Sequence, residues 1–122
     1  MALRGLRGAI TVEENSQRAI WKAAQLLITE LLSANKIHPD TIGAVIFSST
    51  KDLTAAFPTT GVRQLPNFQH LPFFDTQQTD VEESMPKCIR VLVLADIDKS
   101  LTEICHVYLG DAKKLRPDLV CR

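Results

Sequence analysis

The chain has 122 residues, of which 45% are apolar, and its 14 basic residues are balanced by 14 acidic ones. This length fits one domain, 1–122, and the zero net charge argues against a general nucleic-acid binder, which usually carries a basic excess. No apolar run approaches the roughly 18 residues of a membrane span, and no charged-then-apolar leader opens the chain. We therefore expect one cytoplasmic domain.

The cysteines and histidines show no pattern typical of a metal site. The number of cysteines is odd, no C-x-x-C pair occurs, and the histidines lack metal-ligand spacing with each other or with the cysteines. The sequence predicts no metal, and reduced thiols are the default for a cytoplasmic protein. The six residues are Cys88, Cys105, Cys121, His38, His70 and His106.

The chain opens with Leu3–Val12, which predicts a first strand interrupted by Gly5 and Gly8. This segment also carries Arg4 and Arg7. Positions three apart in a regular strand face opposite sides of a sheet. One of the two arginines can therefore face solvent while the other faces a site.

A helix is predicted over residues 17–34. Asn15 or Ser16 can cap its first turn by accepting hydrogen bonds from free amides, and Asn35 is a plausible left-handed stop. Lys22 lies off the apolar stripe of this helix. The residues that recur at helical spacing are Ile20, Ala24, Leu27 and Leu31.

The middle of the chain alternates short elements. His38–Asp40 predicts a turn, and the apolar, partly β-branched run Ile42–Phe47 predicts a buried strand. Ser48–Phe57 is polar and is expected to be a loop. Pro58 suits the first turn of a second helix, which we expect to end near Leu65. Leu71–Phe74 predicts a third strand.

The last third begins with Gln77–Lys87, a polar and acidic segment that predicts a loop. Cys88–Ala95 is the strongest strand signal, Asp96–Thr102 predicts a turn, and Ile104–Leu109 predicts a last strand. A short basic segment, Ala112–Leu115, follows. Alternating strands and helices followed by two strands indicate an α/β or α+β fold, with a mixed sheet of about five strands packed against two helices.

Arg90 stands between Ile89 and Val91, inside an otherwise apolar strand. Arginine is almost never fully buried unless it is paired. Either the strand has an edge or a solvated face here, or the guanidinium points into a pocket and holds an anion. Arg63 and Arg116 add cations near the candidate pocket loops, although a surface location is the simpler interpretation of both.

Motifs of nucleophilic and nucleotide-dependent enzymes are absent from the sequence. There is no G-x-S-x-G, no Gly-rich phosphate loop and no G-x-G-x-x-G. An enzyme with this sequence would work with arginines, a tyrosine and few acids. Such a set suits a reaction that needs anion binding and electrostatic stabilisation, not a nucleophile.

Five segments, spread over essentially the whole chain, carry a family resemblance. They are R-G-x-R-G-A-x-T-V-E (Arg4–Glu13), D-L-x-x-x-F-P (Asp52–Pro58), K-C-I-R-V (Lys87–Val91), H-V-Y-L (His106–Leu109) and L-R-P-D-L (Leu115–Leu119). In this order and spacing they resemble the monofunctional chorismate mutases of the small trimeric, Bacillus-type class. Each segment is weak by itself, but five together are highly specific.

The resemblance implies a homotrimer with a pseudo-barrel core and a site at each of its three subunit interfaces. It implies no cofactor and no metal. The implied reaction is the one-step pericyclic rearrangement of chorismate, a dicarboxylate, to prephenate in aromatic amino acid biosynthesis. Oligomerisation also fits the length, since a single core of this size buries only about two thirds of the surface of the unfolded chain.

The resemblance also implies roles for single residues. Arg7 should pair with a substrate carboxylate, and Arg90 should reach the ether oxygen as its bond to carbon breaks. Tyr108 should donate to a carboxylate, and Phe57 should wall the pocket from a neighbouring subunit. The implied catalytic set is Arg7, Asp75, Gln78 and Arg90.

The remaining residues that the resemblance implies lie at the entrance of the active site or in the segment 74–78. Arg63 and Arg116 match basic positions near the entrance, where they can attract the dianion, and Leu115 lies beside them. The implied substrate-binding set is Arg7, Phe57, Arg63, Phe74, Asp75, Thr76, Gln77, Gln78, Arg90, Tyr108, Leu115 and Arg116.

One segment departs from the family pattern. The family usually has a cysteine where Asp75 stands and a glutamate where Gln78 stands, and that glutamate accepts a hydrogen bond from the substrate hydroxyl. Gln78 can still accept through its amide oxygen but carries no charge. Asp75 can supply the charge if the backbone here is not a regular strand, so that both side chains reach one pocket. Otherwise the enzyme is weakened or altered.

Two alternatives stay open at this point. One is another small trimeric enzyme with interface arginines, such as an imine-hydrolysing, deaminase-like protein. It would lack the Lys87–Val91 and His106–Leu109 segments together. The other is a non-catalytic sensor of an aromatic or dicarboxylate metabolite, an alternative that the missing glutamate keeps open. A direct chorismate-depletion assay separates both from a chorismate mutase.

Overall fold

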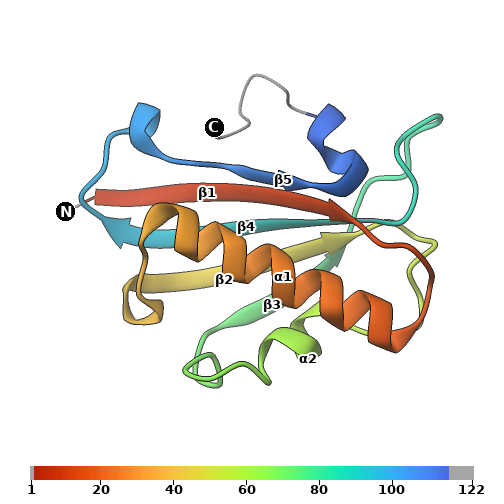
Figure 1. Ribbon diagram of the computed structural model, residues 1–122, viewed down its shortest axis with the longest axis horizontal. Helices are drawn as coiled ribbons and strands as arrows, with labels where there is room; N and C mark the ends of the chain where they lie inside the picture. The colour runs from red at the N-terminus through yellow and green to blue at the C-terminus, as the bar shows by residue number, and fades with distance from the viewer. Residues whose placement is uncertain (1, 116–122) are drawn as a thin grey trace.

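The computed structural model describes residues 2–115. Within them a mixed β-sheet carries two α-helices packed against it (Figure 1). The strands follow the order β3-β2-β4-β1-β5 across the sheet. Their bounds are β1 (Ala2–Thr11), β2 (Ile42–Ser49), β3 (Phe73–Gln77), β4 (Cys88–Ile97) and β5 (Val107–Leu109).

The sheet combines both kinds of strand pairing. β4 lies between β1 and β2 and is antiparallel to both, whereas β5 is parallel to β1 and β3 is parallel to β2. Neither edge strand is joined to its neighbour by a hairpin, because parallel strands need longer connections. The predicted architecture, a mixed sheet of about five strands with two helices, is confirmed in the described part of the chain.

Helix α1 spans Gln17–Asn35 and crosses one face of the sheet (Figure 1). Ser16 caps it, with its hydroxyl accepting a 3.1 Å hydrogen bond from the backbone N–H of Ala19. The left-handed residue at its end is Lys36, with a φ of 53°, so the expectation for Asn35 was wrong. Asn35 is buried instead, and its amide bonds both the N–H and the carbonyl of Cys105.

The core lies between α1 and one face of the sheet. β1 is continuous, and the predicted interruption at its glycines is wrong. Gly8 allows a close approach of α1, since a Cβ there would lie 3.0 Å from the Leu27 Cδ1 atom. The fully buried side chains of this core include Leu6, Ile20, Leu27, Ile28, Leu31, Val45, Phe47, Ile89 and Val93.

Helix α2 spans Pro58–Val62, so it ends before the predicted Leu65. It is held against α1 by two hydrogen bonds, from Trp21 Nε1 to the Phe57 carbonyl at 3.2 Å and from Gln25 Nε2 to the Gly61 carbonyl at 2.8 Å. A Cβ on Gly61 would lie 2.7 Å from the Trp21 Cγ atom, so only glycine permits this spacing. The position of α2 is therefore fixed by its contact with α1.

Two strand boundaries differ from the prediction for physical reasons. β3 begins at Phe73 and continues to Gln77, because its polar residues form an edge strand paired on one side with β2. The last strand begins at Val107 and not at Ile104, since the backbone of Cys105 is bonded to the Asn35 side chain. β4 extends beyond the predicted Ala95 to Ile97.

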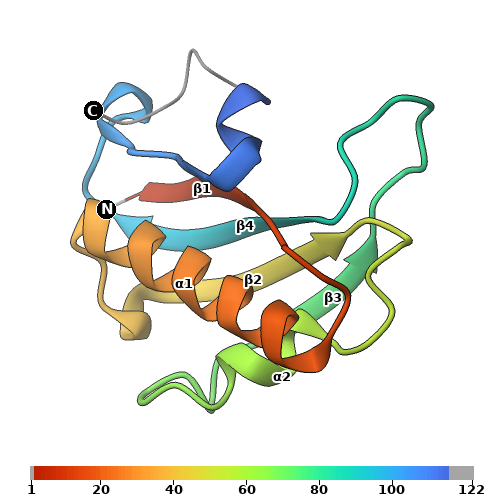
Figure 2. The same ribbon diagram turned by 45° about the vertical axis from the view of Figure 1, so that its right-hand side comes forward.

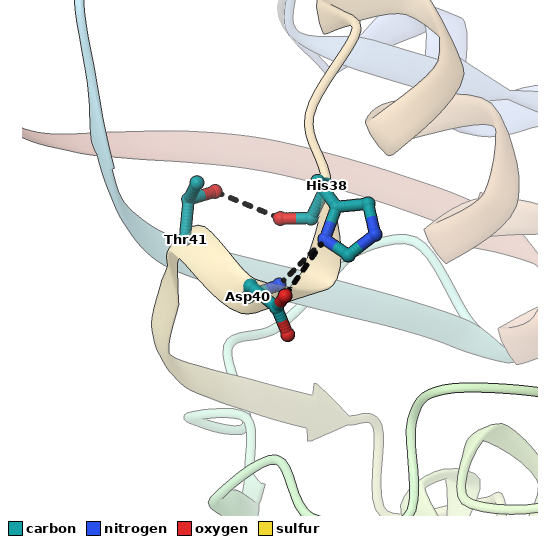
Figure 3. Close-up of polar contacts among 3 residues, drawn as sticks. All are labelled: His38, Asp40 and Thr41. Atoms are coloured by element: carbon teal, nitrogen blue, oxygen red, sulfur yellow. Dashed lines mark hydrogen bonds and ion pairs between the residues drawn. The ribbon is translucent and has the colours of Figure 1, made fainter.

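Three 3-10 helices complete the described part: η1 (Pro39–Thr41), η2 (Leu101–Glu103) and η3 (Gly110–Lys114). Figure 3 shows how His38 begins η1. Its Nδ1 atom accepts from the Asp40 N–H at 3.2 Å, and the Thr41 hydroxyl donates to the His38 carbonyl at 2.8 Å. His38 therefore caps a turn, as a surface histidine would.

The other face of the sheet is not covered by α1 or α2 (Figure 1). Cross-strand register places Phe74, Ile46, Leu92 and Arg7 in one row across β3, β2, β4 and β1. Phe74 is 65% exposed, and so is Leu3 at the start of β1. This face is thus apolar in its middle and open in the single chain.

No helix among residues 2–115 is long and apolar enough to cross a membrane. Of the cysteines in this range, Cys88 is a buried free thiol, as expected, whereas Cys105 is disulfide-bonded, so the expectation of reduced thiols is wrong for Cys105. No group of three or more His, Cys, Asp or Glu residues in the described part could hold a metal ion.

Candidate active site

A first hollow lies on the open face of the sheet, next to β5. Its volume is about 110 Å³. Ala9 on β1 lies directly opposite both Arg90 on β4 and Tyr108 on β5, so these residues stand side by side on the same face. The hollow is lined by Arg7, Gly8, Ala9, Arg90, Val91, Tyr108 and Leu115.

The polar groups of this hollow are only partly satisfied. The Arg90 Nε atom and the Tyr108 hydroxyl are buried and have no hydrogen-bond partner among residues 2–115. Buried polar atoms are nearly always bonded in native proteins, so an exception calls for an explanation such as a missing ligand. Burial raises the pKa of the Cys88 thiol, which the nearby Arg90 guanidinium opposes. Cys88 therefore stays a neutral packing residue beside the arginine.

A second hollow lies at the opposite edge of the sheet, between β3 and α2. Its volume is about 390 Å³. The Thr59 hydroxyl donates a 2.5 Å hydrogen bond to Asp75 Oδ2, whereas Asp75 Oδ1 is buried without a partner in the described part of the chain. The residues that line this hollow are Phe57, Thr59, Thr60, Arg63, Gln69, Leu71, Phe73 and Asp75.

A third hollow, also of about 390 Å³, lies under the loop that follows β3. Figure 2 shows this loop, residues 78–87, projecting beyond the end of the sheet. Gln78 continues the β3 pairing through its N–H, which donates to the Ser49 carbonyl at 2.9 Å. Its side-chain Oε1 atom is buried and has no partner among the residues that the structure describes. The side-chain amide of Gln78 therefore forms part of the wall of this hollow, and its oxygen can accept a hydrogen bond.

Asp75 and Gln78 do not share a pocket within one chain. β3 is a regular strand through Gln77, so the condition under which Asp75 and Gln78 could reach one pocket, an irregular backbone here, is not met within one chain. Asp75 lies opposite Phe47, whose side chain is in the core, and therefore faces the α2 side. Alternation places the side chain of Gln78 on the other side.

Every buried side-chain N or O atom without a partner in residues 2–115 belongs to a residue predicted for the site. The four atoms are Asp75 Oδ1, Gln78 Oε1, Arg90 Nε and Tyr108 Oη. They lie on three strands and one loop end, and three separate segments of the chain supply them. Such a concentration of unsatisfied groups is typical of a site that binds a polar ligand.

Comparison with known proteins agrees with this assignment. Residues 3–119 match the family model of chorismate mutase type I. The chain belongs to the type I chorismate mutases. It is 43% identical to chorismate mutase AroH of Thermus thermophilus over 118 residues, which are 96% of each protein. It is 37% identical to chorismate mutase AroH of Bacillus subtilis over 119 residues, which are 98% of this chain and 94% of the relative.

A solved structure supports the same family through the fold. A chorismate mutase from Clostridium thermocellum superposes with a TM-score of 0.88 at 37% identity, and the match covers 91% of this chain and 98% of the other. The chain is therefore a chorismate mutase, an isomerase, and neither alternative drawn from the sequence is favoured.

The remaining residues predicted for the active site of this chorismate mutase occupy the following positions in the structure. Phe57 is 67% exposed at the rim of the second hollow. Arg63 is exposed beside it, with Nη2 at 3.4 Å from the Thr60 hydroxyl. Gln77 is exposed, and the hydroxyl of Thr76 donates to the Phe47 carbonyl at 3.0 Å. Arg116 lies outside the described residues.

Thr59 is a site residue that sequence reasoning missed. It lies 16 residues before Asp75 in a five-residue helix, and only the folded chain brings the two side chains together. A hydroxyl after Pro58 is an ordinary helix-start residue, so no local pattern sets it apart. Its contact with the one site residue that departs from the family pattern makes it part of the candidate site.

Proposed function

We propose that this enzyme converts chorismate to prephenate as a cytoplasmic homotrimer, at active sites formed between neighbouring subunits. Each site would combine the Arg7–Arg90 hollow of one subunit with the Asp75 hollow of the next. The observation that carries the proposal is the separation of the two hollows within a chain. β1 and β3 are three strand spacings apart, about 14 Å at the usual interval.

The exposed surface of the chain supports this arrangement. Phe57 and Phe74 are each about two-thirds exposed, with values of 67% and 65%. Large exposed apolar side chains commonly mark an interface. Ile46 and Leu92 continue the row of Phe74 along the uncovered face of the sheet, whereas Phe57 lies at the hollow beside α2. A second and third copy of the chain would bury both regions.

The chemistry needs no nucleophile. In the rearrangement one C–O bond breaks while one C–C bond forms, and electrons move around a ring without a proton transfer. Negative charge develops on the ether oxygen, so a fixed guanidinium from Arg90 stabilises the transition state more than the ground state. Its unpartnered Nε atom is a donor already in place. One such donor is worth about 10²–10³-fold in rate by analogy with oxyanion holes.

The other groups bind and orient the substrate. Arg7, which is exposed at the mouth of the first hollow, would pair with a carboxylate, and the Tyr108 hydroxyl would donate to a carboxylate. Holding the enolpyruvyl arm over the ring also lowers the activation barrier, because the reacting atoms are already oriented for bond formation. The substrate hydroxyl would donate to Asp75 Oδ1, with Gln78 as the second candidate acceptor.

Subunit complementation tests the shared site. Arg90→Ala inactivates one half of each site, and Phe57→Asp places a repelling charge in the other half. If two chains supply the halves, equal amounts of the two variants refolded together should recover about a quarter of the parental chorismate-depletion rate, because one in four interfaces joins two intact halves. Sedimentation should give three chains per particle. A mixture that stays inactive, or an active monomer, would refute the proposal.

A further inference from the structure

We infer that Thr59 is a positioning residue for the chemical step, because it fixes the Asp75 carboxylate so that only one of its oxygens faces the substrate. This inference rests on the proposed role of Asp75 as acceptor for the substrate hydroxyl. Thr59 is 5% exposed at the wall of the second hollow, and its hydroxyl is already engaged by Asp75. It acts through the hydrogen bond that it donates to Asp75 Oδ2 at 2.5 Å.

The hydroxyl of Thr59 is held in place by its surroundings. Thr59 lies in α2, which contacts α1 through the Trp21 and Gln25 hydrogen bonds and through Gly61. These contacts restrict the movement of α2 relative to α1. The donor is therefore preorganised, and the Asp75 side chain must adapt to it.

This contact divides the two oxygens of Asp75 between two tasks. Oδ2 accepts from Thr59, so its best acceptor direction is occupied. Oδ1 is buried and has no partner in residues 2–115, so it is the oxygen left for a ligand. A carboxylate held at one oxygen presents the other at a defined position, which lowers the cost of ordering it when substrate binds.

The aspartate also needs such a partner more than the usual family residue would. An ionised carboxylate on a half-buried strand residue carries a desolvation cost that charge-assisted hydrogen bonds offset. No ion pair to Asp75 occurs among the described residues, and the Thr59 hydroxyl is the donor that it has. Thr59 and Asp75 therefore form one functional unit in this chain.

A double-mutant cycle tests the inference. Thr59→Val removes the hydroxyl at nearly constant volume, and it should lower kcat/KM by roughly tenfold, as expected for one hydrogen bond to a charged group. Thr59→Ser keeps the donor and should stay within about twofold of the parent. In a background with Asp75→Cys and Gln78→Glu, which restores the usual family arrangement, Thr59→Val should cost less than about twofold.

Controls separate positioning from folding. Thermal melting checks each variant, and Thr59→Ala replaces Thr59→Val if the valine does not fold. Thr41→Val removes a remote hydroxyl bond of η1 and should keep parental kinetics. Equal losses from Thr59→Val in both backgrounds, or no loss in the parent, would overturn the inference. Parental activity of Asp75→Asn would overturn the proposed role of Asp75 and this inference with it.

Discussion

Arg90 and Tyr108 lie on either side of Ala9, the first on β4 and the second on β5, and each has a buried polar atom without a partner within residues 2–115. Two donors therefore point to one side of the sheet within two strand spacings. This arrangement suits an anion with two charged groups, and it places the cation at the centre of the sheet, where the backbone is rigid.

Replacing Arg90 tests whether its planar fork matters. Arg90→Ala should lower turnover by roughly 10²–10³-fold, and Arg90→Lys should do nearly as much damage, since lysine offers one point charge where two directed donors are needed. Steady-state measurement of kcat and KM by chorismate depletion checks both. Near-normal turnover of the lysine variant would show that the fork is unimportant.

Arg7 should behave differently because its carboxylate contact exists before and during the reaction. Arg7→Ala should therefore mainly raise KM, by roughly tenfold or more, and change kcat much less. The same assay, run over a wide range of chorismate concentrations, separates the two parameters. A loss confined to kcat, with unchanged KM, would contradict the binding role.

If Asp75 supplies the carboxylate in place of the usual family glutamate, Asp75→Asn should lose more activity than Gln78→Ala. Asp75→Asn removes the charge of the only acid in the second hollow, whereas Gln78→Ala removes a neutral amide. The first should reduce kcat/KM by at least roughly tenfold and the second by only a few-fold, since hydrogen bonds to charged groups are the stronger ones. If Gln78→Ala does more harm than Asp75→Asn, the amide carries the hydroxyl contact.

Much of the fold follows from local patterns in the sequence. The apolar runs of β2 and β4 and the stripe of α1 were predicted within a few residues, because burial on a face imposes a regular spacing. β3 was placed too early because its polar residues carry no such signal. An edge strand of this kind is defined by its pairing with β2, which depends on the tertiary structure and not on a local sequence pattern.

The site was only partly predictable. Arg90 stands out as a charge within an apolar strand, and the family resemblance pointed to Arg7, Asp75, Gln78 and Tyr108. The division of these residues among separate hollows could not be predicted, because it depends on strand order and on which face each side chain occupies. Side-chain contacts between distant segments, such as that of Thr59, leave no local trace.

Asp52 predicts a pH dependence of stability. Burial of its carboxyl acts to raise the pKa, but hydrogen bonds donated by the Thr50 hydroxyl and the Lys87 N–H outweigh it, and the pKa lies below its ordinary value of 3.8. The bond to Lys87 N–H, at 2.9 Å to Oδ2, ties the end of the 78–87 loop to the segment before α2. The Asp52 carboxylate therefore stabilises the fold when it is ionised.

The sign of the effect follows from the lowered pKa. Stability from Asp52 is fully present above the unfolded pKa and is lost as the pH falls through the lower, folded value. Asp52→Asn should thus lower the melting temperature by roughly 2–5 °C at pH 7, a modest amount because the side chain is exposed. The difference from the parent should shrink as the pH falls below 3.8.

Melting curves of the parent and of Asp52→Asn between pH 7 and pH 3 measure this directly. Asp80→Asn is a matched control, since it removes a surface carboxylate that pairs with Lys51 at 2.8 Å. An exposed ion pair of this kind contributes about 0–1 kcal/mol, so its melting temperature should stay close to that of the parent. A difference for Asp52→Asn that is the same at every pH would show that the carboxylate charge is not what holds the loop.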